Sequence, residues 1–453
     1  MNPDRPQERP RSGSLYALAV LFAINLLNFF DRQLLGVLGE PIRQEWGLSD
    51  TALGGANTAF VLLYAFAGVP LGRLADRVTR TRILAAGVFV WSALTAATGF
   101  ARSYAELFLW RLGVGMGEAS CAPAASSLIG DLFPAQRRAR ALSIFMLGLP
   151  LGLALSFALG GLLARSLGWR SAFYMAALPG IACALAVLLV QDPPRGAAEA
   201  YAVGSQQRDG SAYRLLLTTP TLLWIIASGA LHNFAMYSFS SFLAPFLMRC
   251  HGLDLRQAGF IGMLVSLSGI PGLLIGGFVG DARGSRRPEG RLRFGAMAVA
   301  LAAPLMWLGL QQGAGHVRAF AIFTSLGCAA MYAYYSVVYA AIQDVVEPAL
   351  RGTAMALYFF AMYLLGGALG PLATGFASDQ FARQAAATAG IVTLAAADLD
   401  RVRAEGLRLA MCLVPALSLV VAGVLVAASR TIGADRQRLC DWMRDQPSSK
   451  TGR

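Results

Sequence analysis

Long apolar runs follow one another along almost the whole chain, and short polar segments rich in arginine separate them. Each run is long enough to cross the roughly 30 Å hydrocarbon layer of a membrane as a helix. Backbone groups inside that layer must form hydrogen bonds within the segment, which a single run achieves only as a helix. The pattern therefore predicts an all-α membrane protein with twelve transmembrane helices, at about residues 15–38, 52–72, 82–100, 104–129, 140–164, 170–190, 221–247, 257–280, 293–311, 317–341, 353–377 and 407–429.

The composition agrees with this prediction and excludes several classes of protein. Of the 453 residues, 56% are hydrophobic and 14% are charged, and the mean hydropathy is +0.55. An ordinary soluble domain has about 25% charged residues, so a cytosolic enzyme and a disordered chain are excluded. The formal net charge of +13 does not indicate nucleic-acid binding, because the arginines lie in short loops, where they set the orientation in the membrane.

Basic residues are concentrated on one side of the predicted helices. They precede span 1, follow span 12, and occupy the segments between spans 2 and 3, 4 and 5, and 8 and 9. Because loops rich in arginine remain in the cytoplasm, we expect both termini there. Lys450 is the only lysine, a bias typical of GC-rich bacterial genomes. These features predict a multi-pass protein of a cell inner membrane. The chain also lacks the Gly-Lys-Ser/Thr sequence that a Walker-type ATP-binding loop needs.

The sequence repeats itself. Residues 72–76 (GRLAD) match residues 277–281 (GFVGD) at an offset of 205, and Asn28-Phe29 match Asn233-Phe234 at the same offset. Two similar six-helix halves are the plan of a carrier that rocks around a central site.

The longest cytoplasmic linker, residues 192–218, separates an N-terminal half (1–191) from a C-terminal half (219–453). A second polar stretch, about 378–406, joins spans 11 and 12 on the opposite side. We expect a solvated loop that can form a short surface helix, and a role in substrate entry is the alternative.

Four charged residues lie well inside predicted spans, away from the span ends: Asp31 and Arg32 in span 1, and Arg111 and Glu118 in span 4. Each ionised group costs about 2.5–3.5 kcal/mol at a helix centre, so such groups face a cavity or a partner. We expect Asp31 and Glu118 to be wetted from a central cavity and to accept protons, which would switch a two-state fold. The alternative is a static ion pair, and each arginine could hold a carboxylate or a substrate's anionic head.

Spans 7, 10 and 11 are instead rich in aromatic and methionine side chains. A cavity with a charged wall and an apolar wall suits an amphiphile, a lipid-like small molecule. Packing within the bundle or against membrane lipids is the alternative for each of these residues, and His232 could donate to a polar head or simply pack. The candidate cavity residues are Asn28, His232, Asn233, Phe234, Tyr237, Tyr335, Tyr358 and Phe359.

Residues 72–80 (GRLADRVTR) resemble the cytoplasmic loop motif of the major facilitator superfamily, although Thr79 stands where that motif usually has glycine. The resemblance implies the major facilitator fold with its two pseudo-symmetric six-helix halves. Further segments resemble the spinster lipid transporters: residues 24–32 (INLLNFFDR), 117–120 (GEAS), 131–133 (DLF) with Arg137 and Arg138, and 192–196 (DPPRG). That resemblance implies a monomeric, proton-linked carrier of lysophospholipids or sphingosine-phosphate-like lipids.

The major facilitator resemblance also implies a conformational lock on the cytoplasmic side. A lock residue should affect turnover more than substrate affinity. The alternative for the arginines is plain anchoring on the positive side of the membrane. The candidate lock residues are Gly72, Asp76, Arg77, Arg80, Asp131, Arg137 and Arg138.

Two other functions compete with lipid transport. A major facilitator exporter of drugs or other small amphiphiles would share the fold. An intramembrane enzyme would need a nucleophile with a base or a metal cluster. The chain has only three histidines, no HExxH motif and no serine with a plausible histidine partner. We therefore expect no catalytic residues, no metal and no cofactor.

Overall fold

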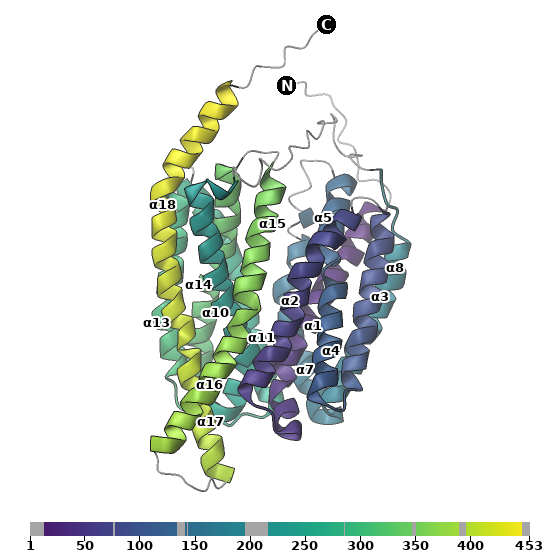
Figure 1. Cartoon of the computed structure of the whole chain (residues 1–453), viewed down its shortest axis with the longest axis vertical. Helices are drawn as coiled ribbons and strands as arrows, with labels where there is room; N and C mark the ends of the chain where they lie inside the picture. Colours follow the sequence, from purple (N-terminus) through teal and green to yellow (C-terminus); the bar gives the residue numbers. More distant parts are fainter. Residues whose placement is uncertain are drawn as a thin grey trace. The chain divides into compact units, whose positions relative to one another are not determined.

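The structure is a computed structural model of the chain, and it describes residues 13–75, 78–133, 141–142, 144–194, 216–284, 286–346, 350–388 and 396–445. All regular structure in these ranges is helical (Figure 1). Eleven of the helical segments are long and apolar enough to cross a membrane. The remaining predicted span, 104–129, consists of two shorter helices, α4 (Tyr104–Glu118) and α5 (Cys121–Leu132). The all-α fold is confirmed, and the arrangement is consistent with twelve spans.

The chain divides into two compact units. The first comprises Met1–Leu35 and Ala59–Gly204, and the second comprises Gly36–Thr58 and Ser205–Arg453. The chain passes from one unit to the other within the predicted linker. Residues 36–58, which the sequence places in the N-terminal half, belong by their packing to the second unit.

The first unit contains the two spans with interior charges and the helices that pack around them. α3 packs against α4, α5 and α8, and α7 packs against α8 (Figure 1). Gly115 of α4 faces the backbone of α2, since a Cβ there would lie 2.3 Å from the Phe60 carbonyl oxygen. Small residues permit such close helix contacts in membranes. The helices are α1 (Ser14–Trp46, to Leu35), α2 (Asp50–Ala75, from Ala59), α3 (Arg80–Gly99), α4, α5, α7 (Gly148–Leu167) and α8 (Trp169–Leu188).

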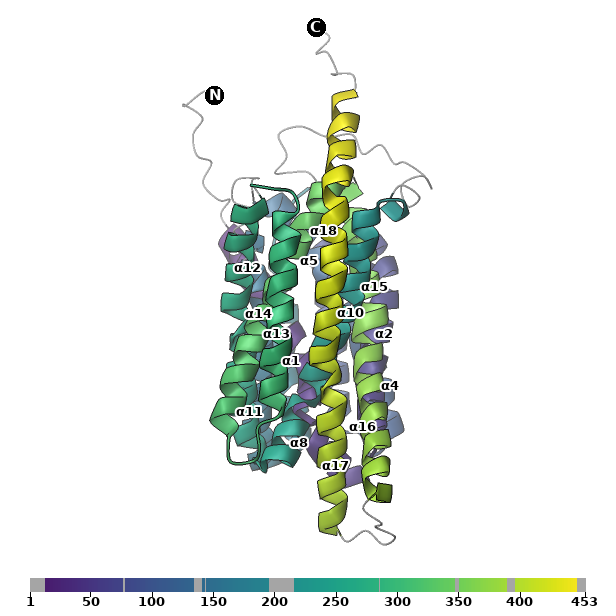
Figure 2. The same cartoon turned by 90° about the vertical axis from the view of Figure 1, so that its left-hand side faces the viewer.

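In the second unit, α14 packs against α12 and α13, α18 packs against α10 and α13, and α16 packs against α17 (Figure 2). A short π-helical turn, η2 (Met362–Gly367), joins α15 to α16. The helices are α10 (Pro220–His251), α11 (Leu255–Leu267), α12 (Gly269–Gly284), α13 (Gly290–Leu310), α14 (Val317–Val345), α15 (Arg351–Ala361), α16 (Leu369–Thr388), α17 (Ala396–Met411) and α18 (Leu413–Asp445).

Local sequence signals set the turn between α10 and α11. α10 ends at His251, and the next residue, Gly252, has a φ of +67°, a left-handed conformation that favours glycine. α11 begins with a capping box, in which Asp254 accepts from the Gln257 backbone and Gln257 accepts from the Asp254 backbone.

The predicted loop over 378–406 is wrong for most of its length. α16 continues to Thr388, α17 begins at Ala396, and residues 389–395 lie outside the described ranges. α17 is amphipathic: Val402, Leu407 and Ala410 are buried. The side chains of Asp400, Arg401, Arg403, Glu405 and Arg408 are partly or fully exposed. Hydropathy misses such a helix because its mean polarity resembles that of a loop, although one face is apolar.

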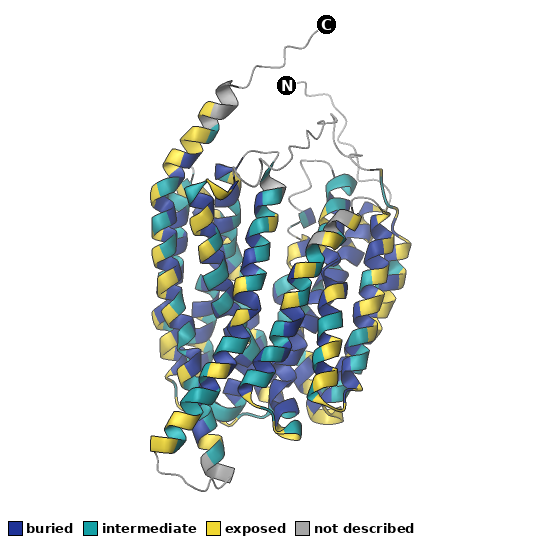
Figure 3. Ribbon diagram, in the orientation of Figure 1, coloured by how far each residue is buried: buried dark blue, intermediate teal, exposed yellow. Residues whose placement is uncertain are grey.

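Exposed residues, yellow in Figure 3, occur along the length of the helices. Many of the exposed side chains are large and apolar. Phe278 and Leu189 are each 76% exposed. Apolar patches of this extent are rare on soluble proteins, whereas in a membrane they face lipid.

Candidate functional site

The four intramembrane charges come together in the first unit. Asp31, Arg32, Arg111 and Glu118, called here the charge cluster, are all buried. Arg32 Nη2 lies 3.4 Å from Glu118 Oε2. Arg111 Nη1 donates to the Asp31 backbone oxygen at 3.4 Å, and the Thr95 hydroxyl donates to Asp31 Oδ2 at 3.5 Å. The side chain of Asn28, one turn before Arg32, accepts from Arg32 Nη2 at 3.1 Å.

Aromatic rings of α1 and α2 cover the two guanidinium groups. The Arg32 carbon Cζ lies 4.5–5.2 Å from the ring centroids of Phe29, Phe60 and Tyr64. Arg111 Cζ lies 5.0 Å from the Phe60 centroid. Such contacts stabilise a cation where water is excluded. The close approach of α2 at Gly115 brings Phe60 to this position.

We expected water in a central cavity to reach the carboxylates of Asp31 and Glu118, but both are buried. The exposed fractions of Asp31 and Glu118 are 1% and 0%. Among the described residues, Asp31 Oδ1, Glu118 Oε1, and Arg111 Nε and Nη2 have no hydrogen-bond partner. Buried polar groups are destabilising unless they are bonded, so these atoms retain hydrogen-bonding capacity that the described residues do not use.

Aromatic side chains of α10, α14, α15 and η2 form a second group, in the second unit. Tyr237, Tyr335, Tyr339, Phe359 and Tyr363, called here the aromatic cluster, are all half-buried. Neighbouring ring centroids in this cluster are 5.6–6.4 Å apart. The Tyr335 hydroxyl donates to Asn233 Oδ1 at 3.3 Å.

Three other predicted cavity residues lie around this cluster. His232 is 1% exposed and stacks on Tyr334 with 4.0 Å between ring centroids. Tyr358 is fully buried, and its hydroxyl donates to the Tyr334 hydroxyl at 3.3 Å. Phe234 is half-buried on α10. In this conformation His232 and Tyr358 are therefore packed residues.

Of the predicted lock residues, Arg80 and Asp131 meet in the first unit. Arg80 forms ion pairs with Asp131 and with Asp192, the latter at 2.7 Å, and donates to the Pro193 carbonyl at 2.6 Å. Gly72 lies in α2. Asp76, Arg77, Arg137 and Arg138 lie outside the described residues. The second unit holds a similar group, because Arg291 pairs with both Asp281 and Asp344.

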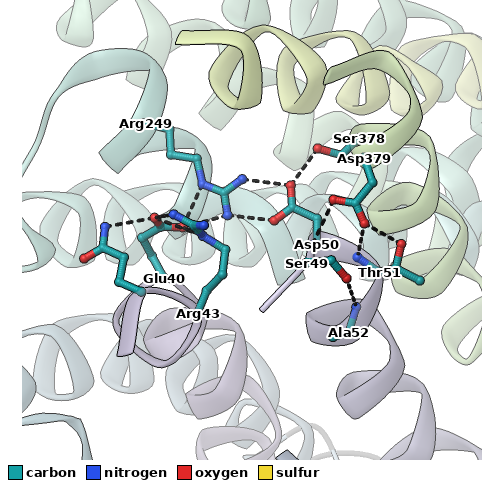
Figure 4. A network of polar contacts seen from close by, with 10 residues as sticks. Glu40, Arg43, Ser49, Asp50, Thr51, Ala52, Arg249, Ser378 and Asp379 are labelled. Carbon is teal, nitrogen blue, oxygen red and sulfur yellow. Dashed lines mark hydrogen bonds and ion pairs between the residues drawn. The ribbon is translucent and has the colours of Figure 1, made fainter. Parts of the chain in front are cut away.

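A buried ion-pair network in the second unit was not predicted (Figure 4). Its centre is Arg249 at the end of α10, which binds Glu40 of α1 at 2.7 Å. Arg249 also donates from both Nη atoms to the two oxygens of Asp50, at 2.8 and 2.7 Å. Arg43 binds Glu40 at 2.7 Å. We call Glu40, Arg43, Asp50 and Arg249 the Arg249 cluster.

α16 completes this network. The Ser378 hydroxyl donates to Asp50 Oδ2 at 2.7 Å. Asp379 accepts from the backbone N–H groups of Asp50 and Thr51 at 3.0 and 2.9 Å, and so caps the N-terminus of α2 (Figure 4). The signal in the sequence was the pair of acidic residues near the facing ends of spans 1 and 2, with an arginine at the end of span 7.

A polar cavity of about 850 Å³ lies beside the Arg249 cluster, also in the second unit. Charged side chains of both signs and three glutamines line it. Its charged residues are Glu40, Arg249, Asp400, Arg401, Glu405 and Arg408. In the described part of the chain, no group of three or more His, Cys, Asp or Glu side chains is placed to hold a metal ion.

Comparisons with known proteins agree with the geometry. The family model of the Major Facilitator Superfamily matches residues 21–371. An MFS-type efflux pump of Mycolicibacterium smegmatis is 34% identical over 366 residues, which cover 80% of this chain and 84% of the pump. Human protein spinster homolog 1 is 29% identical over 82% of this chain and 74% of its own length.

A solved structure extends the similarity to the whole fold. The inward-facing, unoccupied crystal structure of a bacterial homolog to the human lysosomal transporter Spinster has a TM-score of 0.85 at 28% identity, covering 94% of this chain and 99% of that chain. A D-xylose-proton symporter, at 16% identity and a TM-score of 0.71, shares the fold. The chain belongs to the Major Facilitator Superfamily, as a spinster-like transporter.

Proposed function

We propose that this transporter couples proton movement to the movement of an amphiphile, such as a lysophospholipid or a sphingosine-phosphate-like lipid, by alternating access. The charge cluster carries the proposal. It places two carboxylates and two guanidinium groups in one buried group, each carboxylate with one oxygen free of protein partners among the described residues. Intramembrane charges of this kind mark ion and substrate pathways.

Glu118 is the better placed of the two proton acceptors. Its ion-pair partner is Arg32, whose Nη2 lies 3.4 Å from Glu118 Oε2. A proton on Glu118 removes the negative charge that holds Arg32, and Arg32 then becomes available to an anionic head group. Deprotonation restores the ion pair and displaces the head group. Asp31 acts alongside it, held by Thr95 and by the Arg111 contact to its backbone.

The aromatic cluster offers apolar surface and hydroxyl groups instead of charges. Its rings are apolar, and its tyrosine hydroxyls can bond a polar group. Asn28, His232, Asn233, Phe234 and the tyrosines remain candidate substrate contacts in states that open. An amphiphile has an apolar tail suited to such rings, which is why we favour it over a sugar or an ion.

The Arg80 group is the candidate conformational lock. Arg80 ties the start of α3 to Asp131 at the end of α5 and to Asp192 after α8. Together with Gly72, Asp76, Arg77, Arg137 and Arg138, it is proposed to hold the cytoplasmic ends of the helices. A monomer in the inner membrane with both termini in the cytoplasm completes the proposal.

A second candidate function is export of drugs or other small amphiphiles. The 34% identity to an MFS-type efflux pump favours it, and both functions would use the same two clusters. Membership of this superfamily points to a transporter rather than an enzyme.

The decisive experiment is a flux assay in proteoliposomes with lysolipids under an imposed pH gradient. Asp31→Asn and Glu118→Gln should each abolish proton-driven movement. Glu106→Gln is a matched control, because Glu106 is exposed in the first turn of the same helix as Glu118. Unchanged flux in both cluster variants would contradict the coupling scheme. Competition between lysolipids and cationic dyes separates the two functions.

A further inference from the structure

Predicted span 11 is not a continuous α-helix. Between α15 and α16 the six residues of η2, Met362–Gly367, form a π-helical turn. The Ala368 N–H donates to the Tyr363 carbonyl, five residues back, at 2.8 Å. Such turns are rare, are frequently found at functional sites, and are one cause of helix kinks.

The turn depends on a side chain from another helix. Asn233 of α10 donates from Nδ2 to the Met362 carbonyl oxygen at 3.0 Å. In a membrane a carbonyl group has no water to bond, so its partner must come from the protein. The backbones lie close enough for this because residue 366 is glycine: a Cβ there would be 2.4 Å from the Ala230 carbonyl oxygen.

A second hydrogen bond fixes the orientation of the Asn233 amide. Its Oδ1 accepts from the Tyr335 hydroxyl at 3.3 Å. Because the Met362 carbonyl can only accept, Nδ2 must face it and Oδ1 must face Tyr335. Tyr335 therefore holds the amide in the orientation that supports the turn, and Tyr335 belongs to the half-buried aromatic cluster.

The turn also separates two parts of span 11 with different partners. On one side, α15 carries Phe359 of the aromatic cluster. On the other side, α16 carries Ser378 and Asp379, which bind the start of α2. Ser378 lies eleven residues after the turn, about 16 Å along the helix axis. A change of bend at the turn would therefore move one group relative to the other.

We propose that Asn233 is a positioning residue that links substrate contact at Tyr335 to the bend of span 11. A polar group of the substrate that binds the Tyr335 hydroxyl releases Asn233 Oδ1, the amide rotates, and the π-turn loses its external donor. This inference rests on the proposed function, because it needs a substrate with a polar group at the aromatic cluster.

The first test measures transport kinetics in proteoliposomes for Asn233→Ala, Asn233→Leu and Tyr335→Phe. An interhelical hydrogen bond in a membrane is worth on average about 0.6 and at most about 1.7 kcal/mol, so we expect Vmax to fall about 3-fold to 20-fold in all three variants. KM should stay within about twofold in the two Asn233 variants, whereas Tyr335→Phe should also raise KM, because it removes the hydroxyl that the substrate binds. Asn233→Leu keeps the side-chain volume and should be as slow as Asn233→Ala. The double variant Asn233→Ala with Tyr335→Phe should be no slower than Asn233→Ala alone, because the two residues act in series.

Asn25→Ala is the matched control. Asn25 also donates to a carbonyl of another helix, Phe145 O at 2.7 Å, but in the first unit. A raised KM with unchanged Vmax in the Asn233 variants would reduce Asn233 to a substrate contact and overturn the proposal. Equal slowing by Asn25→Ala, or additive losses in the double variant, would overturn it too.

The second test does not require a transported substrate. Hydrogen exchange of the amides of residues 358–372 should be faster in Asn233→Ala than in the unaltered protein and unchanged in Asn25→Ala. Unchanged exchange in Asn233→Ala overturns the role of Asn233 in the turn. If no lysolipid is moved under a pH gradient while exchange does rise, the proposed substrate class fails and the link between Asn233 and the turn stands.

Discussion

At the scale of single residues, the charge cluster and the Arg249 cluster differ in how fully their members are bonded. Within the described residues, both oxygens of Asp50 and of Glu40 have partners. Asp31 and Glu118 each have one oxygen without a partner there. The first arrangement is what a structural ion pair needs, whereas the second leaves capacity to bind a proton or a ligand.

Removal of Arg249 tests the structural role of its cluster. Arg249→Ala leaves Glu40 and Asp50 buried without their shared cation, which should lower the free energy of unfolding by about 3–5 kcal/mol. Thermal unfolding of the purified protein in detergent would measure this as a lower Tm. Arg293→Ala is the control: Arg293 is 57% exposed and 4.0 Å from Glu289, so its removal should cost less than about 1 kcal/mol. Equal Tm values for the two variants would contradict the prediction.

His232 gives a prediction of opposite sign. Its ring is buried against Tyr334, and neither ring nitrogen has a hydrogen-bond partner among the described residues. An unbonded buried polar group costs about 1–3 kcal/mol, so His232→Phe should keep the stacking and raise Tm. A lower Tm would show that the imidazole has a partner. Flux measurements on the same variant test whether His232 contacts substrate.

Sequence analysis predicted the charge cluster but not the Arg249 cluster, for a physical reason. Charges in the middle of a span are rare and costly, so Asp31 and Glu118 stand out. Glu40, Asp50 and Arg249 lie near the ends of spans, where charges are ordinary. Their importance comes from the packing of α1, α2, α10 and α16, which no local pattern reveals.

At the scale of helices, hydropathy located the apolar segments but not their internal breaks. Hydropathy depends only on which residues a segment contains. The break after Glu118 and the π-turn at Met362–Gly367 depend instead on the register of backbone hydrogen bonds. Hydropathy also missed the extension of α18 to Asp445, because this last part of the helix is polar and continues beyond the apolar segment.

Close helix contact gives a prediction at this scale. Gly115→Ala would place a Cβ 2.3 Å from the Phe60 carbonyl, so α2 and α4 must separate; this should lower stability by about 1–3 kcal/mol. Gly113→Ala is the control, because its Cβ would meet the flexible end of Leu94 at 2.7 Å. Both variants gain the same helix propensity. The difference in Tm between them therefore isolates the backbone contact, and no difference would argue against it.

At the scale of the whole molecule, the division into units does not follow the repeat in the sequence. α1 and α2 each have one part in the first unit and one part in the second. Asp50, at the start of α2, binds Arg249 and Ser378 in the second unit. Alternating access moves the two halves of such carriers, so either these contacts break during the cycle or α1 and α2 bend.

Crosslinking distinguishes the two possibilities. In a chain without native cysteines, Asp50→Cys with Ser378→Cys can be joined by a short bifunctional thiol reagent, because the native side-chain oxygens lie 2.7 Å apart. If the contacts break in each cycle, the crosslink should reduce flux at least about tenfold, and reduction should restore it. Thr221→Cys with Thr431→Cys is the control, since their hydroxyls are also 2.7 Å apart within the second unit. Full flux in the crosslinked Asp50 variant would show that residues 36–58 stay with α16 and that α1 and α2 bend instead.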